Sequence, residues 1–227
     1  MGPGSTGTVG VLCAMERELG QLRAAVTGTR QVAGIEVREV GGLGRPVLAV
    51  VSGVGKVRAA AAASALLAAG VDEALVVVGV CGALRRGLGP GDLVHCTPAV
   101  QADLAVVEDR TFEADPDLLR AWQAVAPGAA GWFVTADRPV LNPFRRARLA
   151  RAFLGPCVAD METAAAAAVA ARARVPWAAL RCVSDHAGFG AHRAFRRHFE
   201  ATAGRAADTL PMWLTSSMGR PDPPPSP

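Results

Sequence analysis

Two acidic segments in the second half of the chain carry residues that could move protons. Asp160 and Glu162 lie two residues apart, directly before the alanine-rich run 164–171. Such a run packs tightly in a protein interior, and acids are rarely left unpaired beside so apolar a surface. A third acid, Asp185, follows the apolar run 177–183. We therefore predict that the three carboxylates converge on a site for a hydroxyl-rich substrate whose reaction requires proton transfer.

The segments around these acids must bring them together. The run 164–171 is predicted to be a buried helix, and 177–183 is predicted to be a strand that delivers Asp185 at its carboxyl end. Ligands of open α/β sheets bind at the carboxyl ends of the strands, which favours a functional role for Asp185. The alternative is that Asp185 only caps the segment that follows the strand.

An earlier acidic segment follows the first predicted strand. Glu16 and Glu18 lie at the start of a predicted helix. Acids in a first helical turn are stabilised by the helix dipole, so neither residue needs a function. One of the two could still point back over the end of the strand and reach the site.

The glycine-bearing turn 52–56 matches neither common phosphate-binding motif. Val50 stands where a P-loop has its first glycine, and Val57 stands where it has serine or threonine. The glycines also lack the spacing of a dinucleotide-binding loop. A tight turn between a strand and a helix is the simpler interpretation. The alternative is that its backbone N–H groups face a ligand at the start of the helix.

The cysteines and histidines form no reactive or metal-binding pattern. Cys81 has no histidine close to it in sequence, so we interpret it as a packing residue. His192 and His198 lie six residues apart, a spacing that does not place them on one helix face. We therefore predict no metal site.

Composition narrows the class of protein. The 227 residues are 51% hydrophobic, which fits one α/β domain with a large core. No apolar run is long enough to span a bilayer, and residues 1–5 lack the features of a signal peptide. The five cysteines form no CxxC pair and are odd in number, which indicates reduced thiols in the cytoplasm.

The positive charge is not interpreted as a nucleic-acid surface. The net charge is only +4, and arginine supplies nearly all of the cations, since Lys56 is the only lysine. Abundant arginine, alanine, glycine and proline are typical of a GC-rich genome. The arginines of segment 145–151 are therefore predicted to be a solvated helix face, and no nucleic acid is expected as a partner.

Strand and helix patterns alternate along the chain. Strands are predicted at 8–14, 35–40, 46–52, 73–78, 93–98, 131–135, 157–159 and 177–183. Helices are predicted at 15–25, 57–69, 116–125, 143–153, 164–171 and 192–214, and a loop is predicted at 79–84. This order predicts a single three-layer α/β/α domain over residues 1–218, with a mixed, mostly parallel central sheet. The Pro-rich tail, 219–227, is predicted to be disordered.

Five short segments occur in an order that identifies a family. They are AMERELGQL, SGVGKV, GVCGAL with GDLV, VADMETAAAA and RCVSDHA. Together they resemble the nucleoside phosphorylase/nucleosidase superfamily, and most of all its methylthioadenosine/S-adenosylhomocysteine nucleosidase branch. The likeness covers about residues 8–214. It implies a phosphorylase-like fold, a small-molecule nucleoside substrate, no cofactor, and a homodimer in which one subunit closes the 5′ pocket of the other.

The resemblance implies cleavage of the N-glycosidic bond of a ribonucleoside. Such a reaction needs an acid for the departing purine, a base for the nucleophile and a hold on the ribose. Asp185 matches the acid that protonates or hydrogen-bonds N7, and Glu18 matches the carboxylate that activates water. Glu162 matches the glutamate that binds the ribose hydroxyls, while Met161 packs against the sugar. Arg181 matches the arginine that holds the nucleophile or the nearby carboxylates.

The resemblance assigns further residues to the substrate site. Asp160 stands on the base side, where the branch usually has glutamate, and Val140 offers backbone contacts to the base. Ser184 and Val80 are also expected in the substrate site. Pro139 replaces the aromatic residue that stacks on the base, which removes an interaction of about 1 kcal/mol.

Two departures bear on the nucleophile. Val80 replaces the loop serine, and Val77 stands where the phosphorylases of the superfamily have an arginine. Hydrolysis is therefore favoured over phosphorolysis.

Our hypothesis is a nucleosidase acting on a 5′-modified adenosine. The alternatives are a purine nucleoside phosphorylase, a nucleosidase for adenosylhopane or aminofutalosine, and a non-catalytic nucleoside-binding protein.

Overall fold

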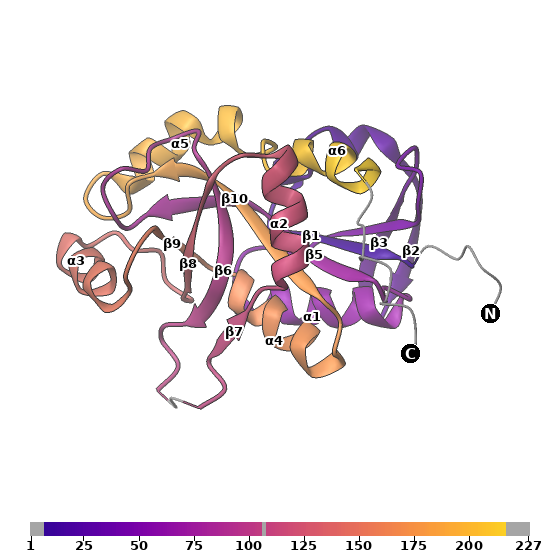
Figure 1. The fold of residues 1–227 in the computed structure, drawn as a ribbon, viewed down its shortest axis with the longest axis horizontal. Helices are drawn as coiled ribbons and strands as arrows, with labels where there is room; N and C mark the ends of the chain where they lie inside the picture. The colour runs from indigo at the N-terminus through magenta and orange to yellow at the C-terminus, as the bar shows by residue number, and fades with distance from the viewer. Residues whose placement is uncertain (1–6, 106–107, 217–227) are drawn as a thin grey trace, which may run out of the picture.

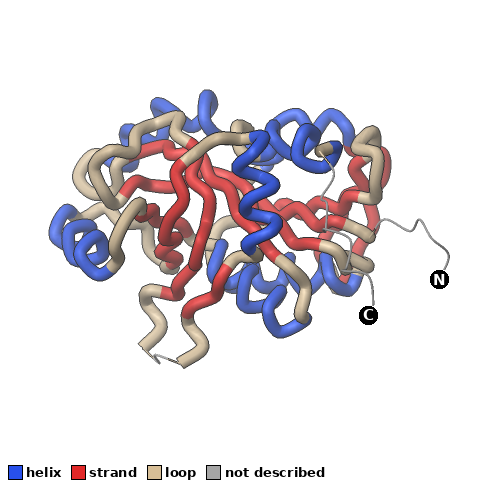
Figure 2. The backbone as a smooth tube through the Cα atoms, viewed as in Figure 1, coloured by secondary structure: helices blue, strands red, loops and turns tan. Residues whose placement is uncertain are grey.

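The computed structural model describes residues 7–105 and 108–216 and shows a mixed sheet with helices on both of its faces (Figures 1 and 2). The strands are β1 (Val9–Cys13), β2 (Val26–Val32), β3 (Ile35–Val40), β4 (Val47–Val51), β5 (Ala74–Ala83), β6 (Leu93–Gln101), β7 (Thr111–Glu113), β8 (Ala129–Thr135), β9 (Cys157–Asp160) and β10 (Trp177–Asp185). The α-helices are α1 (Lys56–Ala68), α2 (Pro116–Val125), α3 (Pro143–Ala152), α4 (Thr163–Ala173), α5 (Ala191–Thr202) and α6 (Leu210–Thr215). Two 3₁₀ helices are η1 (Glu16–Ala25) and η2 (Ala207–Thr209). The predicted mixed α/β class is confirmed.

Part of the sheet closes on itself. β5 pairs with both β10 and β9, and the path β10–β6–β8–β9 returns to β5. β1, β4, β3 and β2 continue outward from β5. Parallel pairs join β1 to its two neighbours, β5 to β10, and β8 to β6 and β9. Antiparallel pairs are as frequent among the described strands. β2, β3 and β4 form hairpins, and the closure of the sheet pairs β6 with β10 and β9 with β5 in opposite directions. The sheet is thus less parallel than predicted.

Small side chains let two helices lie close to the sheet. α1 and α4 run side by side under it in Figure 1, and their alanines Ala59, Ala62, Ala164 and Ala167 are fully buried there. A helix of alanines presents little volume, so its axis can approach a sheet closely. This packing fixes the position of the N-terminus of α4, where Glu162 stands. The opposite face is covered by η1, α2 and α6.

The predicted loop at 79–84 is wrong, because β5 continues through it to Ala83. Gly79 and Gly82 suggested a break, but both pair with β10 in register with Arg181 and Asp185. The same segment also pairs with β9. Pairing with β9 and β10 holds this glycine-rich segment in an extended conformation, which it would not keep alone.

The predicted single helix at 192–214 is also wrong. The chain forms α5, then η2 and α6, with a break after Thr202. Gly204 packs against Gly20 of η1, and a side-chain carbon on Gly204 would lie 2.8 Å from the Cα of Gly20. This close packing of two glycines lies directly after α5, where the chain passes into η2. Gly20 itself has a φ of 54°, a left-handed conformation that favours glycine and kinks η1.

Other differences are smaller. Strand β2, which forms the edge of the sheet, was not predicted. The predicted helix at 116–125 is found at those bounds as α2, capped by Asp115. The predicted disordered tail, 219–227, lies outside the described residues. Among those residues, none of the helices combines the length and the apolar character needed to cross a membrane.

Candidate active site

A cavity of about 530 Å³ lies at the carboxyl ends of β5 and β10. It also receives residues from η1, from the segment between β8 and α3, from the start of α4 and from α5. The nine residues predicted for the site all line this cavity: Glu18, Val80, Val140, Asp160, Met161, Glu162, Arg181, Ser184 and Asp185. The three acids predicted to converge, Asp160, Glu162 and Asp185, are all found at this cavity.

Glu18 is fully buried and held by backbone N–H groups. Its Oε2 accepts from the N–H of Ala14 and of Met15, both at 2.9 Å, and its Oε1 accepts from the N–H of Val80 at 2.9 Å. Burial raises the pKa of Glu18 to about 7, while Arg181 and the Val80 N–H act in the opposite direction. The carboxyl is thus fixed in place and titrates near neutral pH.

Gly79 explains how Glu18 can sit so close to β5. A side-chain carbon at this position would lie 2.5 Å from Glu18 Oε1 and 2.9 Å from an amino nitrogen of Arg181. Gly79 also has a φ of 146°, in the region that side chains rarely adopt. Only glycine leaves room for the acid and the cation against this strand.

Arg181 is the buried cation of the site. Its Nη2 lies 3.1 Å from Glu162 Oε2 and 3.2 Å from Asp160 Oδ2, and its Nη1 donates to the carbonyl of Val80 at 3.0 Å. Burial alone would lower the pKa of the guanidinium, but Asp160, Glu162 and Glu18 together raise it. Arg181 therefore stays charged and compensates the surrounding acids.

The carboxylate of Asp160 is out of reach of a substrate, because its side chain is fully buried. Its Oδ1 accepts from the hydroxyl of Thr135 at 2.5 Å, and its Oδ2 is bonded by the N–H and hydroxyl of Thr163 and by Arg181. Its side chain is fully buried, so its contribution to the cavity is backbone. We interpret Asp160 as a residue that orients Arg181 and the start of α4.

Glu162 faces the cavity at the N-cap of α4. Its Oε1 accepts from the N–H of Gly55 at 3.0 Å, and its Oε2 pairs with Arg181. Each carboxylate oxygen can accept further bonds, so both can still bind a ligand hydroxyl. Burial raises the pKa of Glu162, and Arg181 counters that shift. The turn 52–56 thus donates one backbone N–H, that of Gly55, to Glu162.

Asp185 ends β10 beside Ser184. Its Oδ1 accepts from the N–H of Ala187 at 2.8 Å, and its Oδ2 lies 2.9 Å from the hydroxyl of Ser184. That hydroxyl also lies 3.2 Å from the carbonyl of Cys81. It has one proton and two acceptors, so both bonds form together only when Asp185 carries a proton. Burial raises the pKa of Asp185, which also favours the protonated form.

The segment between β8 and α3 lines one side of the cavity. We call its residues Arg138, Pro139, Val140 and Leu141 the base-side wall. The carbonyl of Val140 accepts from the N–H of Gly188, which ties the wall to the loop after Asp185. No aromatic side chain stands in this wall.

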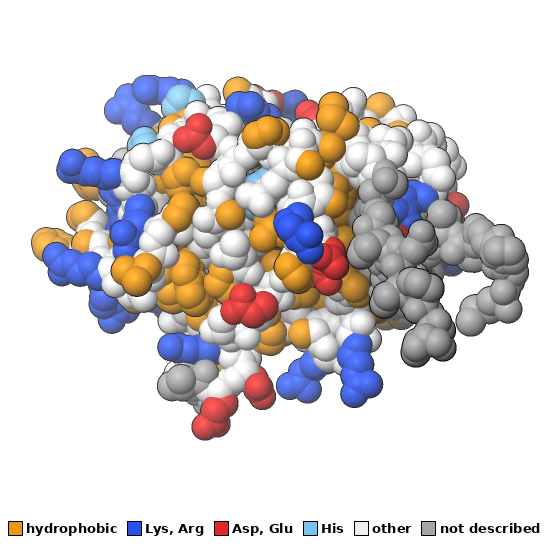
Figure 3. All heavy atoms as spheres, viewed as in Figure 1, with side chains coloured by type: hydrophobic (Ala, Val, Ile, Leu, Met, Phe, Trp, Pro, Cys, Tyr) orange, Lys and Arg blue, Asp and Glu red, His pale blue; other side chains and the backbone are white. Residues whose placement is uncertain are grey.

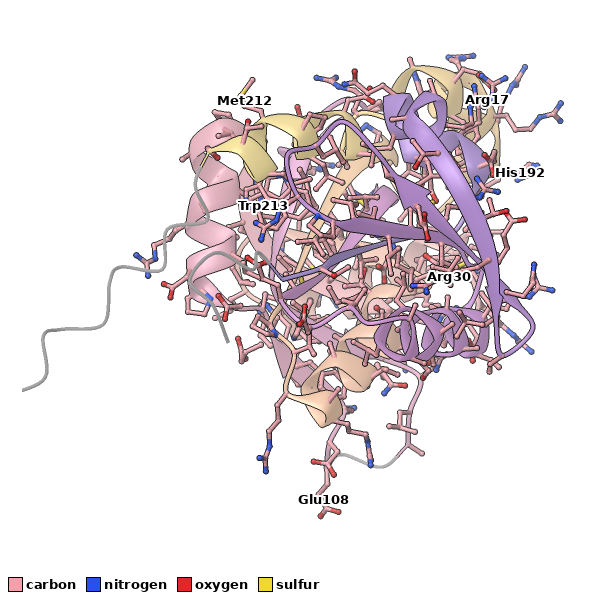
Figure 4. All side chains as sticks on the ribbon, turned by 90° about the vertical axis from the view of Figure 1, so that its right-hand side faces the viewer. Arg17, Arg30, Glu108, His192, Met212 and Trp213 are labelled. Carbon is pink, nitrogen blue, oxygen red and sulfur yellow. The ribbon has the colours of Figure 1, made fainter. Side chains whose placement is uncertain are left out.

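Sequence reasoning missed that α5 lines the cavity, where it contributes Ala191 in addition to two larger side chains. Phe195 and His192 line the cavity, and His192 lies exposed at the edge of the molecule (Figure 4). The amphipathic pattern of α5 could have indicated its inner face, but not which cavity that face meets. Within residues 7–105 and 108–216, no three His, Cys, Asp or Glu side chains are grouped so that they could hold a metal ion.

Comparisons with known proteins agree on one family. The family description that matches residues 8–216 is the phosphorylase superfamily. A curated 5′-methylthioadenosine/S-adenosylhomocysteine nucleosidase of Tolumonas auensis is 26% identical over 214 residues, covering 86% of this chain and 93% of that protein. The Shewanella oneidensis protein of the same name is 27% identical over 198 residues, covering 79% and 84%.

Solved structures give the same result for the fold. The S-adenosylhomocysteine nucleosidase of Streptococcus pyogenes, in complex with 5-methylthiotubericidin, superposes with a TM-score of 0.86 at 25% identity and covers 94% of this chain and 98% of that one. The futalosine hydrolase of Helicobacter pylori has a TM-score of 0.81 at 23% identity, covering 92% and 96%, which shows likeness of fold alone.

Proposed function

The chain belongs to the phosphorylase superfamily, and from this premise we propose that it is an N-ribosyl hydrolase that cleaves the N-glycosidic bond of a 5′-modified adenosine or a related purine nucleoside. The observation that carries the proposal is the placement of Glu18, Glu162 and Asp185 in one cavity with Arg181 behind them. The similar nucleosidases described above support the substrate class.

In the proposed mechanism, two acidic side chains carry out the two proton transfers. Asp185 donates a proton to the purine as the glycosidic bond breaks, because an anionic purine leaves slowly. Glu18, held by three backbone N–H groups, accepts the proton of the attacking water. The carboxylate of Glu162 binds the ribose hydroxyls, and Met161 contacts the sugar. Water replaces the base at the anomeric carbon, and the products are the free purine and the 5-substituted ribose.

The cavity favours water over phosphate as the nucleophile. Val77 is buried in the core on the side of α1 and α4 and does not line the cavity. Val80 lines it, but its N–H and carbonyl already bond Glu18 and Arg181. Arg181 in turn is engaged by Asp160 and Glu162. An entering phosphate dianion would meet the carboxylates of Glu18 and Glu162 here, and the cation beside them, Arg181, is already engaged.

The product identifies the nucleophile. Incubation with methylthioadenosine should release adenine and free methylthioribose, at a rate that does not change when phosphate is added. Chromatography of the sugar product with and without phosphate measures this, and adenosylhomocysteine, aminofutalosine and inosine tested beside it rank the substrates. Formation of a ribose 1-phosphate would contradict the proposal.

Loss of the acid should slow the chemical step. Asp185→Asn keeps the size of the side chain but cannot donate the proton, and a positioned acid contributes about 10²–10⁴-fold. We expect kcat to fall by that factor, with less loss on substrates that have a better leaving group. Asp117→Asn, at an exposed carboxylate paired with Arg120, is the matched control and should keep parental kcat. Near-parental turnover by Asp185→Asn would remove this residue from the mechanism.

The pH dependence of kcat/KM in the Asp185→Asn variant should identify Glu18 as the base. In the parent, Glu18 and Asp185 both titrate, so the pH profile reports macroscopic values of the pair. In the variant residue 185 no longer titrates, and Glu18 acts as a base only when it is ionised. Residual kcat/KM should therefore fall about tenfold per pH unit below the pKa of Glu18 and level off above it. That pKa is about 7, so a flat profile from acid to neutral pH would refute the assignment.

We also propose that the enzyme is a homodimer. Apolar side chains are exposed at Leu141 (49%), which lines the cavity, at Phe144 in α3 (83%) and at Phe189 in the loop after Asp185 (97%). Figure 3 shows hydrophobic side chains on the surface in the region of α3. Val54 and Leu141 also line the cavity, so a second chain that covers them would close it. Sedimentation should give twice the mass of the 23.3 kDa chain, and Phe144→Glu with Phe189→Glu should weaken the association. A parent that sediments as a monomer at assay concentration would contradict this.

We also propose that the enzyme is located in the cytoplasm. All five cysteines are buried free thiols, which is typical of proteins from a reducing compartment. Cys81 bonds Ser184 only through its carbonyl, and burial raises the pKa of its thiol well above the ordinary value. It therefore acts as a packing residue.

A further inference from the structure

Lys56 stands where a lysine is unfavourable. It is the first residue of α1, after an N-cap glycine that offers no side-chain cap, and no acid lies in the first turn. A cation at a helix N-terminus is destabilised by the helix dipole. Helix formation alone therefore does not explain Lys56, and its contacts outside α1 must.

Lys56 joins three separate segments of the chain. Its ammonium lies 2.6 Å from Asp103 Oδ1, in the segment after β6, and 3.4 Å from Asp137 Oδ2, in the segment after β8. The N–H of Asp137 donates to Asp103 Oδ2 at 2.8 Å, which closes the triangle. The lysine side chain is only 15% exposed. Burial would lower the pKa of Lys56, but Asp103 and Asp137 raise it, and Lys56 lowers the pKa of Asp103.

Two parts of the active site meet at this triangle. Gly55, directly before Lys56, donates its N–H to Glu162. Asp137 directly precedes the base-side wall, 138–141. Lys56 therefore links the residue that binds the ribose to the segment that faces the base.

The base-side wall depends on contacts with other segments to keep its conformation. Residues 138–141 form no helix or strand. The N–H of Gly188 bonds the carbonyl of Val140 at the far end, and at the near end the carbonyl of Arg138 accepts only a long, exposed bond of 3.4 Å from the side chain of Arg145. Pro139 offers no aromatic face on which a purine could stack. Contact with the base then depends on how closely the wall is held against it.

We propose that Lys56 is a positioning residue that holds the base-side wall at a fixed place relative to Glu162 and thereby sets the affinity for the purine base. The inference rests on the proposed nucleosidase function for its substrate. Lys56 touches neither base nor sugar and acts only through Asp137 and Asp103.

Four variants test this. Lys56→Met removes the charge and suits a helix start better than lysine does, so any loss is not caused by a weaker α1. Lys56→Arg keeps the charge, and Asp103→Asn removes the partner. Arg58→Met is the matched control, because Arg58 is an exposed cation two residues further along the same helix.

Three measurements separate positioning from simple stability. In Lys56→Met, KM for the nucleoside and the dissociation constant of free adenine should rise about fivefold, with kcat changed less than about twofold. Amide hydrogen exchange at 136–142 should quicken in the same variant. Lys56→Arg should restore most of the affinity, Arg58→Met should match the parent, and Asp103→Asn combined with Lys56→Met should be no worse than Lys56→Met alone.

Two results would overturn the inference. One is a Lys56→Met variant that equals Arg58→Met in KM, adenine affinity and exchange. The other is a loss of kcat and thermal stability in both Lys56 variants with KM unchanged, which would mean a structural role only. If the parent neither cleaves nor binds nucleosides, the proposed function fails. Faster hydrogen exchange at 136–142 in Lys56→Met would still support the link between Lys56 and the wall in that case.

Discussion

The buried guanidinium of Arg181 is the interaction on which the site depends. It lies against two carboxylates, Asp160 and Glu162, and close to Glu18, all inside the protein. Burying one uncompensated charge costs several kcal/mol, so three buried acids near each other would either take up protons or force the site open. The single cation lets them coexist, and its fixed fork of donors also orients Glu162 and the carbonyl of Val80.

The fold makes room for this charge cluster through small residues. Gly79 admits Glu18 and Arg181 to the surface of β5, and a larger residue would meet both. The alanines of α4 bring its N-terminus down onto the sheet, which sets Glu162 beside Arg181. The small residues glycine and alanine therefore allow the polar atoms of the site to reach one another.

The sequence predicted much of this arrangement, but not all of it. The placement of Asp185 followed from a strand with an acid at its end, and the placement of Glu162 followed from an acid before an apolar helix. Glu18 was singled out only by resemblance, because its local pattern is also that of an ordinary helix start. The course of β5 through Gly79 could not be predicted, since strands far away in sequence hold it extended. The contacts of Lys56 lie 47 and 81 residues away and leave no local signal.

Glu18 and Asp185 have different local surroundings, and these favour different protonation states. Burial raises the pKa of both Glu18 and Asp185. Glu18 accepts three backbone N–H bonds and lies near Arg181, and each of these stabilises its ionised form. Asp185 accepts one N–H bond and shares the single proton of Ser184 with the carbonyl of Cys81, an arrangement that is complete only when Asp185 is protonated. These surroundings therefore favour the ionised form of Glu18 and the protonated form of Asp185, which are the forms that the proposed base and the proposed acid need.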